Sequence, residues 1–187
     1  RHQESRRGLR LIGLDIESKR KGSDWSSGTY NFRDLICADF RFADESRHHF
    51  LPFDFSTREL NRWAEPLRSP DLLVVAHNGK YDLRGVNATL IGLGLAPLCE
   101  NRLCDTLKDG PKGDGWIRRD LGAMAIRYGI AAKGSIDRAT WDLAYEGDRR
   151  ARALVETYNK NDVDVVLALQ AAMVKRDHLE APRLWRP

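Results

Sequence analysis

The chain has 187 residues, a length that fits one domain with a sizeable hydrophobic core. Its net charge of +4 permits an anionic partner such as nucleic acid but is too small to establish one. Three cysteines without a CxxC pair argue against a disulfide framework or a zinc site, and no apolar run is long enough to cross a membrane.

The first half of the chain is predicted to consist mainly of strands. Apolar runs bounded by polar residues predict strands at residues 9–15, 35–42, 48–55 and 72–76. Residues 57–67 are predicted to form a helix, and Ser56 is a suitable N-cap for it.

The second half alternates helices with a short strand. Helices are predicted at residues 81–93, 120–128 and 148–175, and a fifth strand at residues 103–105. Strands followed by alternating strands and helices predict an α/β fold, in which a mixed sheet is covered by helices.

One domain is predicted, covering residues 9–176, with residues 1–8 as an N-terminal extension and residues 177–187 as a C-terminal tail. The sequence begins with Arg1 rather than Met, which indicates processing, trimming or excision from a longer protein. The cysteine usage and the charged N-terminus predict a soluble, cytoplasmic protein in a reducing compartment.

Two carboxylates follow the first predicted strand. Asp15 and Glu17 are two positions apart, so in an extended chain they project from the same face. They lie at the carboxyl end of the strand, where open α/β sheets place their ligand sites. The alternative is a strand that runs out into a solvated, acidic turn.

The last predicted helix has a carboxylate on its apolar face. The spacing of three and four that marks this face includes Val155, Tyr158, Asp162, Val166, Leu169 and Met173. A lone buried carboxylate is costly, so Asp162 is expected to be paired or bound to a metal. Tyr158 lies one turn earlier on the same side. A structural salt bridge from Asp162 to an arginine is the alternative.

The segment AHNGKYDL, from Ala76 to Leu83, follows the fourth predicted strand. Asp82 lies at the start of the next helix, beside the same sheet edge, and Asn78 is a candidate N-cap or loop brace. Acids are also favoured in the first turn of any helix by the helix dipole, which is the simpler interpretation of Asp82 alone.

In chain order these segments contain the patterns DxE, NxxxD and YxxxD. Here the chain resembles the DEDD exonucleases, the ribonuclease H-like (DnaQ-like) superfamily of 3′→5′ exonucleases. Tyr158 precedes Asp162 by four residues, as in the DEDDy branch; the DEDDh branch has His five residues before the Asp, where this chain has Thr157. The resemblance implies a ribonuclease H-like fold whose mixed five-stranded sheet has the order 3-2-1-4-5. It also suggests Asp105, in the CDTL segment, as an accessory residue.

The resemblance further implies a two-metal-ion site. Its metal ligands would be Asp15, Glu17, Asp82 and Asp162, and the catalytic set would be these four acids with Tyr158. Oxygen ligands favour Mg²⁺ or Mn²⁺ over zinc, and two such ions can stabilise the attacking and leaving oxygens of a phosphoryl transfer. Tyr158 would orient the attacking water.

Contacts with nucleic acid are less clearly indicated. The candidates are Ile16, Ser18, Lys19, Asn78, Lys80 and Lys133. For the lysines, a solvated surface charge is an equally good interpretation.

The expected activity is removal of 5′-mononucleotides from a free 3′ end, with single-stranded DNA favoured over RNA by analogy with proofreading relatives. An exoribonuclease and the excised proofreading domain of a polymerase are alternatives, and a polymerase or a replication or repair protein is a possible partner. Ribonuclease H endonucleases and resolvases use similar chemistry, but their second acid normally comes from a separate element. A non-catalytic nucleic-acid-binding module is a further alternative, which the complete acid set disfavours.

Overall fold

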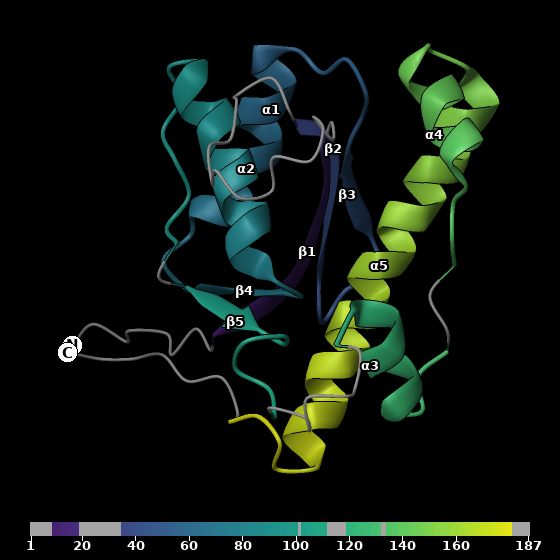
Figure 1. Ribbon diagram of the computed structural model, residues 1–187. Coiled ribbons are helices and arrows are strands. Elements are labelled where there is room, and N and C mark those ends of the chain that lie inside the picture. Colours follow the sequence, from purple (N-terminus) through teal and green to yellow (C-terminus); the bar gives the residue numbers. More distant parts are fainter. Residues whose placement is uncertain (1–8, 19–34, 101, 112–118, 132–133, 181–187) are drawn as a thin grey trace, which may run out of the picture.

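The structure is a computed structural model that describes residues 9–18, 35–100, 102–111, 119–131 and 134–180. Its centre is a five-stranded sheet with the order β3-β2-β1-β4-β5 (Figure 1). The strands are β1 (Arg10–Ser18), β2 (Leu35–Phe42), β3 (His48–Leu51), β4 (Leu72–Ala76) and β5 (Leu103–Asp105). β1 pairs antiparallel with β2 and parallel with β4, so the sheet is mixed, as predicted.

Helices cover both faces of this sheet (Figure 1). One face carries α1 (Thr57–Ala64), the 3₁₀ helix η1 (Pro66–Arg68) and α2 (Gly79–Gly92). The long α5 (Arg149–Lys175) packs on the other face, with α3 (Leu121–Arg127) and α4 (Arg138–Tyr145) against it.

Alternation along β1 separates the two layers. Ile12, Leu14 and Ile16 are buried in the cluster that joins the sheet to α1 and α2. Gly13 points the other way, and a Cβ there would lie 2.7 Å from Cγ of Leu167 on α5. Gly13 therefore allows α5 to pack closely on this face of the sheet. The side chains of Asp15 and Glu17 project from the same face.

Side-chain caps start four of the helices. Ser56 accepts from the Glu59 amide and completes a capping box at α1, as the sequence predicts. Three aspartates cap the later helices in the same way: Asp120 at α3, Asp137 at α4 and Asp148 at α5. These caps fix where α3 and α5 begin, within one residue of the predicted starts.

The predicted boundaries were wrong in several places. β1 continues past residue 15 to Ser18 because Asp15 and Glu17 are paired with Asp39 and Cys37 of β2. β3 ends at Leu51 instead of residue 55, and the first helix ends at Ala64, with the Pro66 segment continuing as a 3₁₀ turn. The helix α4 was not predicted at all.

The limits of the predicted domain stay a prediction, because residues 1–8 and 181–187 lie outside the described residues. Two of the predicted nucleic-acid contacts, Lys19 and Lys133, also lie outside them. α5 itself ends at Lys175, near the predicted domain end. Among the helices that the structure describes, none combines the length and the apolar character needed to cross a membrane.

Candidate active site

Three of the predicted acids come together between β1 and α5. Asp15, Glu17 and Asp162 each place one carboxylate oxygen within 4.8 Å of the others. Asp162 is 2% exposed, and the two acids of β1 are half-buried. Three carboxylates this close repel one another, and a divalent cation would relieve that repulsion.

This convergence follows from local structure. Asp15 and Glu17 project from the face of β1 that α5 covers, since they continue the alternation that begins at Gly13. Asp162 lies on the buried stripe of α5, between Val155 and Val166, which are both at most 1% exposed. The predicted position of Asp162 on a buried face is confirmed.

Asp82 lies on the opposite side of β1, in the first turn of α2. It is buried, and its carboxyl group accepts a hydrogen bond from the backbone amide of Ile16. Burial raises the pKa of Asp82 well above its ordinary value, and the charges of Glu17 and Asp105 raise it further. Asp82 is not part of the group of three, although it is close enough to Glu17 to be affected by its charge. Its role as a metal ligand stays a prediction.

Asp105 braces the loops at the carboxyl edge of the sheet. Its Oδ1 accepts hydrogen bonds from the backbone amides of Asn78, Leu107 and Lys108, at 2.9, 3.0 and 3.2 Å. Asn78 has a left-handed backbone with φ of 67° and occupies the N-cap position of α2 without a capping bond from its side chain. Asn78 thus stabilises the loop through its backbone amide, which donates to Asp105. Asp105 in turn fixes the turn that precedes Asp82.

Tyr158 is partly exposed on α5, one turn before Asp162. The edge of its ring meets Trp141 of α4, with centroids 6.3 Å apart and planes at 84°. Trp141 also contacts Tyr145, at 5.9 Å. The unpredicted helix α4 therefore belongs to the surroundings of the candidate site.

Sequence reasoning missed two polar residues beside the acids. Asn159 is fully buried on α5, and its Nδ2 donates to Oδ2 of Asp15 over 2.6 Å. Its position three residues before Asp162, on the same helix face, was the available indication. Asp39 is the cross-strand partner of Asp15 and is also fully buried. Burial raises the pKa of Asp39 to about 6, and its hydrogen bond from His48 opposes this rise.

Three of the predicted nucleic-acid contacts, Ile16, Ser18 and Lys80, differ in how their side chains are placed. Ile16 has its side chain in the core at 5% exposure, so it could meet a ligand only through its backbone. The Ser18 hydroxyl is hydrogen-bonded to the Tyr81 hydroxyl, and Lys80 is exposed in the first turn of α2. None of these contacts is tested by the structure.

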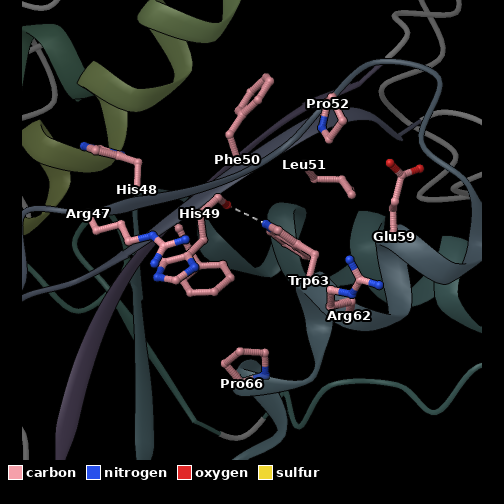
Figure 2. Close-up of a pocket in the computed structure, with 11 residues that line it drawn as sticks. Arg47, His48, His49, Phe50, Leu51, Pro52, Glu59, Arg62, Trp63 and Pro66 are labelled. Atoms are coloured by element: carbon pink, nitrogen blue, oxygen red, sulfur yellow. Dashed lines mark hydrogen bonds between the residues drawn. The ribbon is translucent and has the colours of Figure 1, made fainter.

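A separate hollow of about 360 Å³ lies at the β3 edge of the sheet, beside α1 (Figure 2). Arg47 and Arg62 flank it, and Trp63 and His49 are joined there by a 2.7 Å hydrogen bond from the indole Nε1 to the His49 carbonyl. The acids of the candidate site are not among its lining residues.

Comparisons with known proteins place the fold. No protein-family model matches the sequence, and no curated protein matches it. The solved EXO domain of Nibbler from Aedes aegypti is similar, with a TM-score of 0.56 and 11% identity over 91% of this chain and 79% of that domain.

Two RNase D structures are also similar. The Trypanosoma brucei RNase D–GMP complex has a TM-score of 0.56 and 14% identity over 94% of this chain. Escherichia coli RNase D, an exoribonuclease involved in structured RNA processing, has a TM-score of 0.50 and 20% identity over 89% of this chain. The chain spans 52% and 40% of these two proteins. At such identities the likeness shows a shared fold, and it confirms the predicted ribonuclease H-like architecture with its 3-2-1-4-5 sheet.

Proposed function

We propose that the chain is a metal-dependent 3′→5′ exonuclease, which hydrolyses the last phosphodiester bond at a 3′ end and releases 5′-mononucleotides. The observation that carries this proposal is the group of three acids within 4.8 Å, on a fold shared with exonuclease domains. Tyr158, one turn from Asp162, supports the same assignment.

The residues present fit a divalent cation. All ligand atoms in the group are carboxylate oxygens, which suit Mg²⁺ or Mn²⁺. Asp15, Glu17 and Asp162 would hold one ion, and Asp82, beyond Glu17, would contribute to a second. When bound, such ions would polarise the phosphate and lower the pKa of the attacking water.

The protein's own groups would then position the reactants. Tyr158 would orient the attacking water through its hydroxyl, and its ring is held in place by Trp141. The acids of β1 are partly exposed and therefore accessible to the end of a strand, whereas Asp162 is shielded from water. Shielding strengthens electrostatic interactions with the reacting phosphate.

We propose RNA as the preferred substrate, in place of the DNA that the analogy with proofreading relatives favoured. The support is the likeness to two RNase D structures, one of which is an exoribonuclease. A polymerase partner gains no support from these neighbours. Since the chain spans about half or less of the RNase D proteins, its activity and its partners as part of a larger protein are also proposals.

The proposal is tested with four single-stranded substrates, each with Mn²⁺, Mg²⁺ or EDTA. They are linear RNA and linear DNA labelled at the 5′ end, and circular RNA and circular DNA labelled internally. We expect a ladder of stepwise shortened linear RNA with metal, weaker shortening of linear DNA, and intact circles. Cleavage of circles at a comparable rate would show an endonuclease. Binding of linear RNA without any shortening, with every metal, would favour a non-catalytic module.

A further inference from the structure

Asn159 makes a long-range contact with the acid group. It is 0% exposed, and its Nδ2 donates to Oδ2 of Asp15 over 2.6 Å, across 144 positions of sequence. The carboxylate only accepts hydrogen bonds, so the atom that faces it must be the amide NH₂. A short bond from a neutral donor to a charged acceptor is among the stronger hydrogen bonds.

This contact fixes the direction in which Asp15 presents its oxygens. The last torsion of an aspartate is broad and has no sharp preferred value, so a second contact is needed to define it. Asp15 is also only half-buried, and packing alone does not hold it. The amide of Asn159 therefore helps to set the orientation of one of the three carboxylates in the group.

The other end of the same amide is unsatisfied. Oδ1 of Asn159 is buried and has no hydrogen-bond partner among the described residues. A buried acceptor without a donor is costly, and native structures generally satisfy such groups. The nearby acids, when ionised, cannot supply a donor. A water held by a cation at the acid group would supply one.

We propose that Asn159 is a positioning residue of the metal site. Its Nδ2 orients Asp15 as a ligand, and its Oδ1 accepts a hydrogen bond from a water bound to the cation. The inference rests on the proposed function for its catalytic meaning, but its test uses metal binding and needs no substrate. It assigns Asn159 no contact with the substrate.

The test compares wild type with Asn159→Leu, a change of similar volume that removes both polar ends. The free Mn²⁺ signal in electron paramagnetic resonance gives the Mn²⁺ dissociation constant, and thermal unfolding in EDTA gives stability. We expect a dissociation constant about 10–100-fold higher than in wild type. We expect metal-free stability close to that of wild type, because the loss of the hydrogen bond to Asp15 is offset by removal of the unsatisfied carbonyl. A merely structural role would lower stability and leave metal affinity unchanged.

The matched control is Gln170→Leu, which removes another buried amide from α5. It should bind Mn²⁺ as wild type does. A double-mutant cycle with Asp15→Asn adds a second criterion: Asn159→Leu should cause little further loss of affinity once Asp15 can no longer act as a charged ligand. If Asn159→Leu does not fold, Asn159→Ser takes its place under the same criteria.

The outcomes separate this inference from the proposed function. Wild-type Mn²⁺ affinity in folded Asn159→Leu overturns the inference, as does a wild type that binds no Mn²⁺ at millimolar concentrations. A wild type that binds Mn²⁺ but digests no nucleic acid overturns the proposed function alone. Where activity is present, Asn159→Leu should lower kcat with little change in the KM for RNA, and added Mn²⁺ should restore part of the loss.

Discussion

Asp15 and Asp162 occupy different environments although their carboxylates share one site. Asp15 is half-buried on a strand, and Asp162 is 2% exposed on a helix. Asp15→Asn and Asp162→Asn each remove a proposed ligand charge, so each should reduce exonuclease activity at least about 1,000-fold. The gel assay on linear RNA measures this. Asp164→Asn is the control, because Asp164 lies on the same helix but is half-exposed in an ion pair with Arg41. Equal losses in Asp164→Asn and Asp162→Asn would contradict the assignment.

Tyr158 is expected to act through its hydroxyl alone. Tyr158→Phe keeps the ring that contacts Trp141 and removes the group that orients the water. Activity should fall on the order of 10–1,000-fold while the Mn²⁺ dissociation constant stays at the wild-type value. Single-turnover digestion and Mn²⁺ titration measure the two quantities. Unimpaired digestion by Tyr158→Phe would show that Tyr158 has been given the wrong role.

At the scale of residues, the sequence predicted those site residues whose positions follow from the period of a single strand or helix. The i, i+2 pair Asp15 and Glu17 and the stripe containing Asp162 were found because strand and helix periods are regular. The contact of Asn159 with Asp15 could not be found that way, since it depends on how α5 docks on β1. Asp39 was missed for the same reason: in the sequence Asp39 and Arg41 are two charged residues within an otherwise apolar run, and the burial of Asp39 results from β2 lying inside the sheet.

At the scale of elements, the docking of α5 on β1 depends on a glycine. A Cβ at Gly13 would lie 2.7 Å from Cγ of Leu167 and 3.0 Å from Cγ1 of Val163. Gly13→Ala should therefore lower the free energy of unfolding by about 1–3 kcal/mol. It should also weaken Mn²⁺ binding, because α5 carries Asp162. Urea unfolding and Mn²⁺ titration check both effects. Gly134→Ala, where a Cβ meets nothing within 4 Å, should show neither. If Gly13→Ala has the same free energy of unfolding as wild type, α5 can shift away from β1 without loss of stability.

The pairing of β2 with β3 buries an acid whose pKa should make stability depend on pH. The pKa of Asp39 is raised from 3.8 to about 6, chiefly by burial. Between these values the folded state binds more protons than the unfolded state. This contribution to stability is therefore complete below about pH 4 and is lost as the pH rises through 6. Asp39→Asn removes this loss, so relative to wild type it should gain about 1–3 kcal/mol between pH 4 and pH 7.

Urea unfolding at several pH values measures this difference. Asp44→Asn is the control of opposite sign, because Arg10 lowers the pKa of the exposed Asp44. Removing Asp44 should cost stability mainly at neutral pH, by a small amount. If Asp39→Asn and wild type show parallel pH profiles, the pKa of Asp39 is not raised by folding.

Most elements were predictable because their apolar runs have distinct caps and boundaries, as at Ser56 and Asp148. The end of β1 was not predictable from the sequence. Acidic residues are typical of turns, and only pairing with β2 keeps Asp15 and Glu17 in a strand. α4 has eight residues and one fully buried side chain, Ala144. Helices this short are not stable alone, so α4 depends on its Asp137 cap and on packing against α5.

At the scale of the whole molecule, the acid group should link metal binding to stability. The acids repel one another in the folded state without metal, and they are solvated and far apart in the unfolded chain. A cation at about a hundredfold excess over its dissociation constant adds roughly 2.7 kcal/mol. Mn²⁺ or Mg²⁺ should therefore raise the Tm by about 5–10 °C, and EDTA should reverse the rise.

The Tm of Asp162→Asn, measured with metal and with EDTA, is compared with that of wild type. Without metal this variant should melt no lower than wild type, because one repulsion is relieved, and its response to Mn²⁺ should shrink. Differential scanning fluorimetry measures both. A loss of several kcal/mol in metal-free Asp162→Asn would indicate instead that Asp162 is half of a buried salt bridge.

The sheet order was predicted through a family resemblance based on three short patterns, and the likeness of the fold to the Nibbler and RNase D domains agrees with it. The preference between RNA and DNA was not predictable. Recognition of a 2′-hydroxyl can be made by many side chains or by backbone atoms, so it leaves no fixed spacing in a sequence.

The contact between Asn159 and Asp15, 144 positions apart, has a consequence for biosynthesis. A ribosome makes Asp15 and Glu17 early, and it makes Asp162 only after all five strands of the sheet have been translated. Until α5 emerges and docks, the growing polypeptide holds the acids of β1 without their third member. If the domain hydrolyses RNA, as we propose, it would stay inert beside the messenger that encodes it, and it would gain its activity only after α5 has left the ribosome.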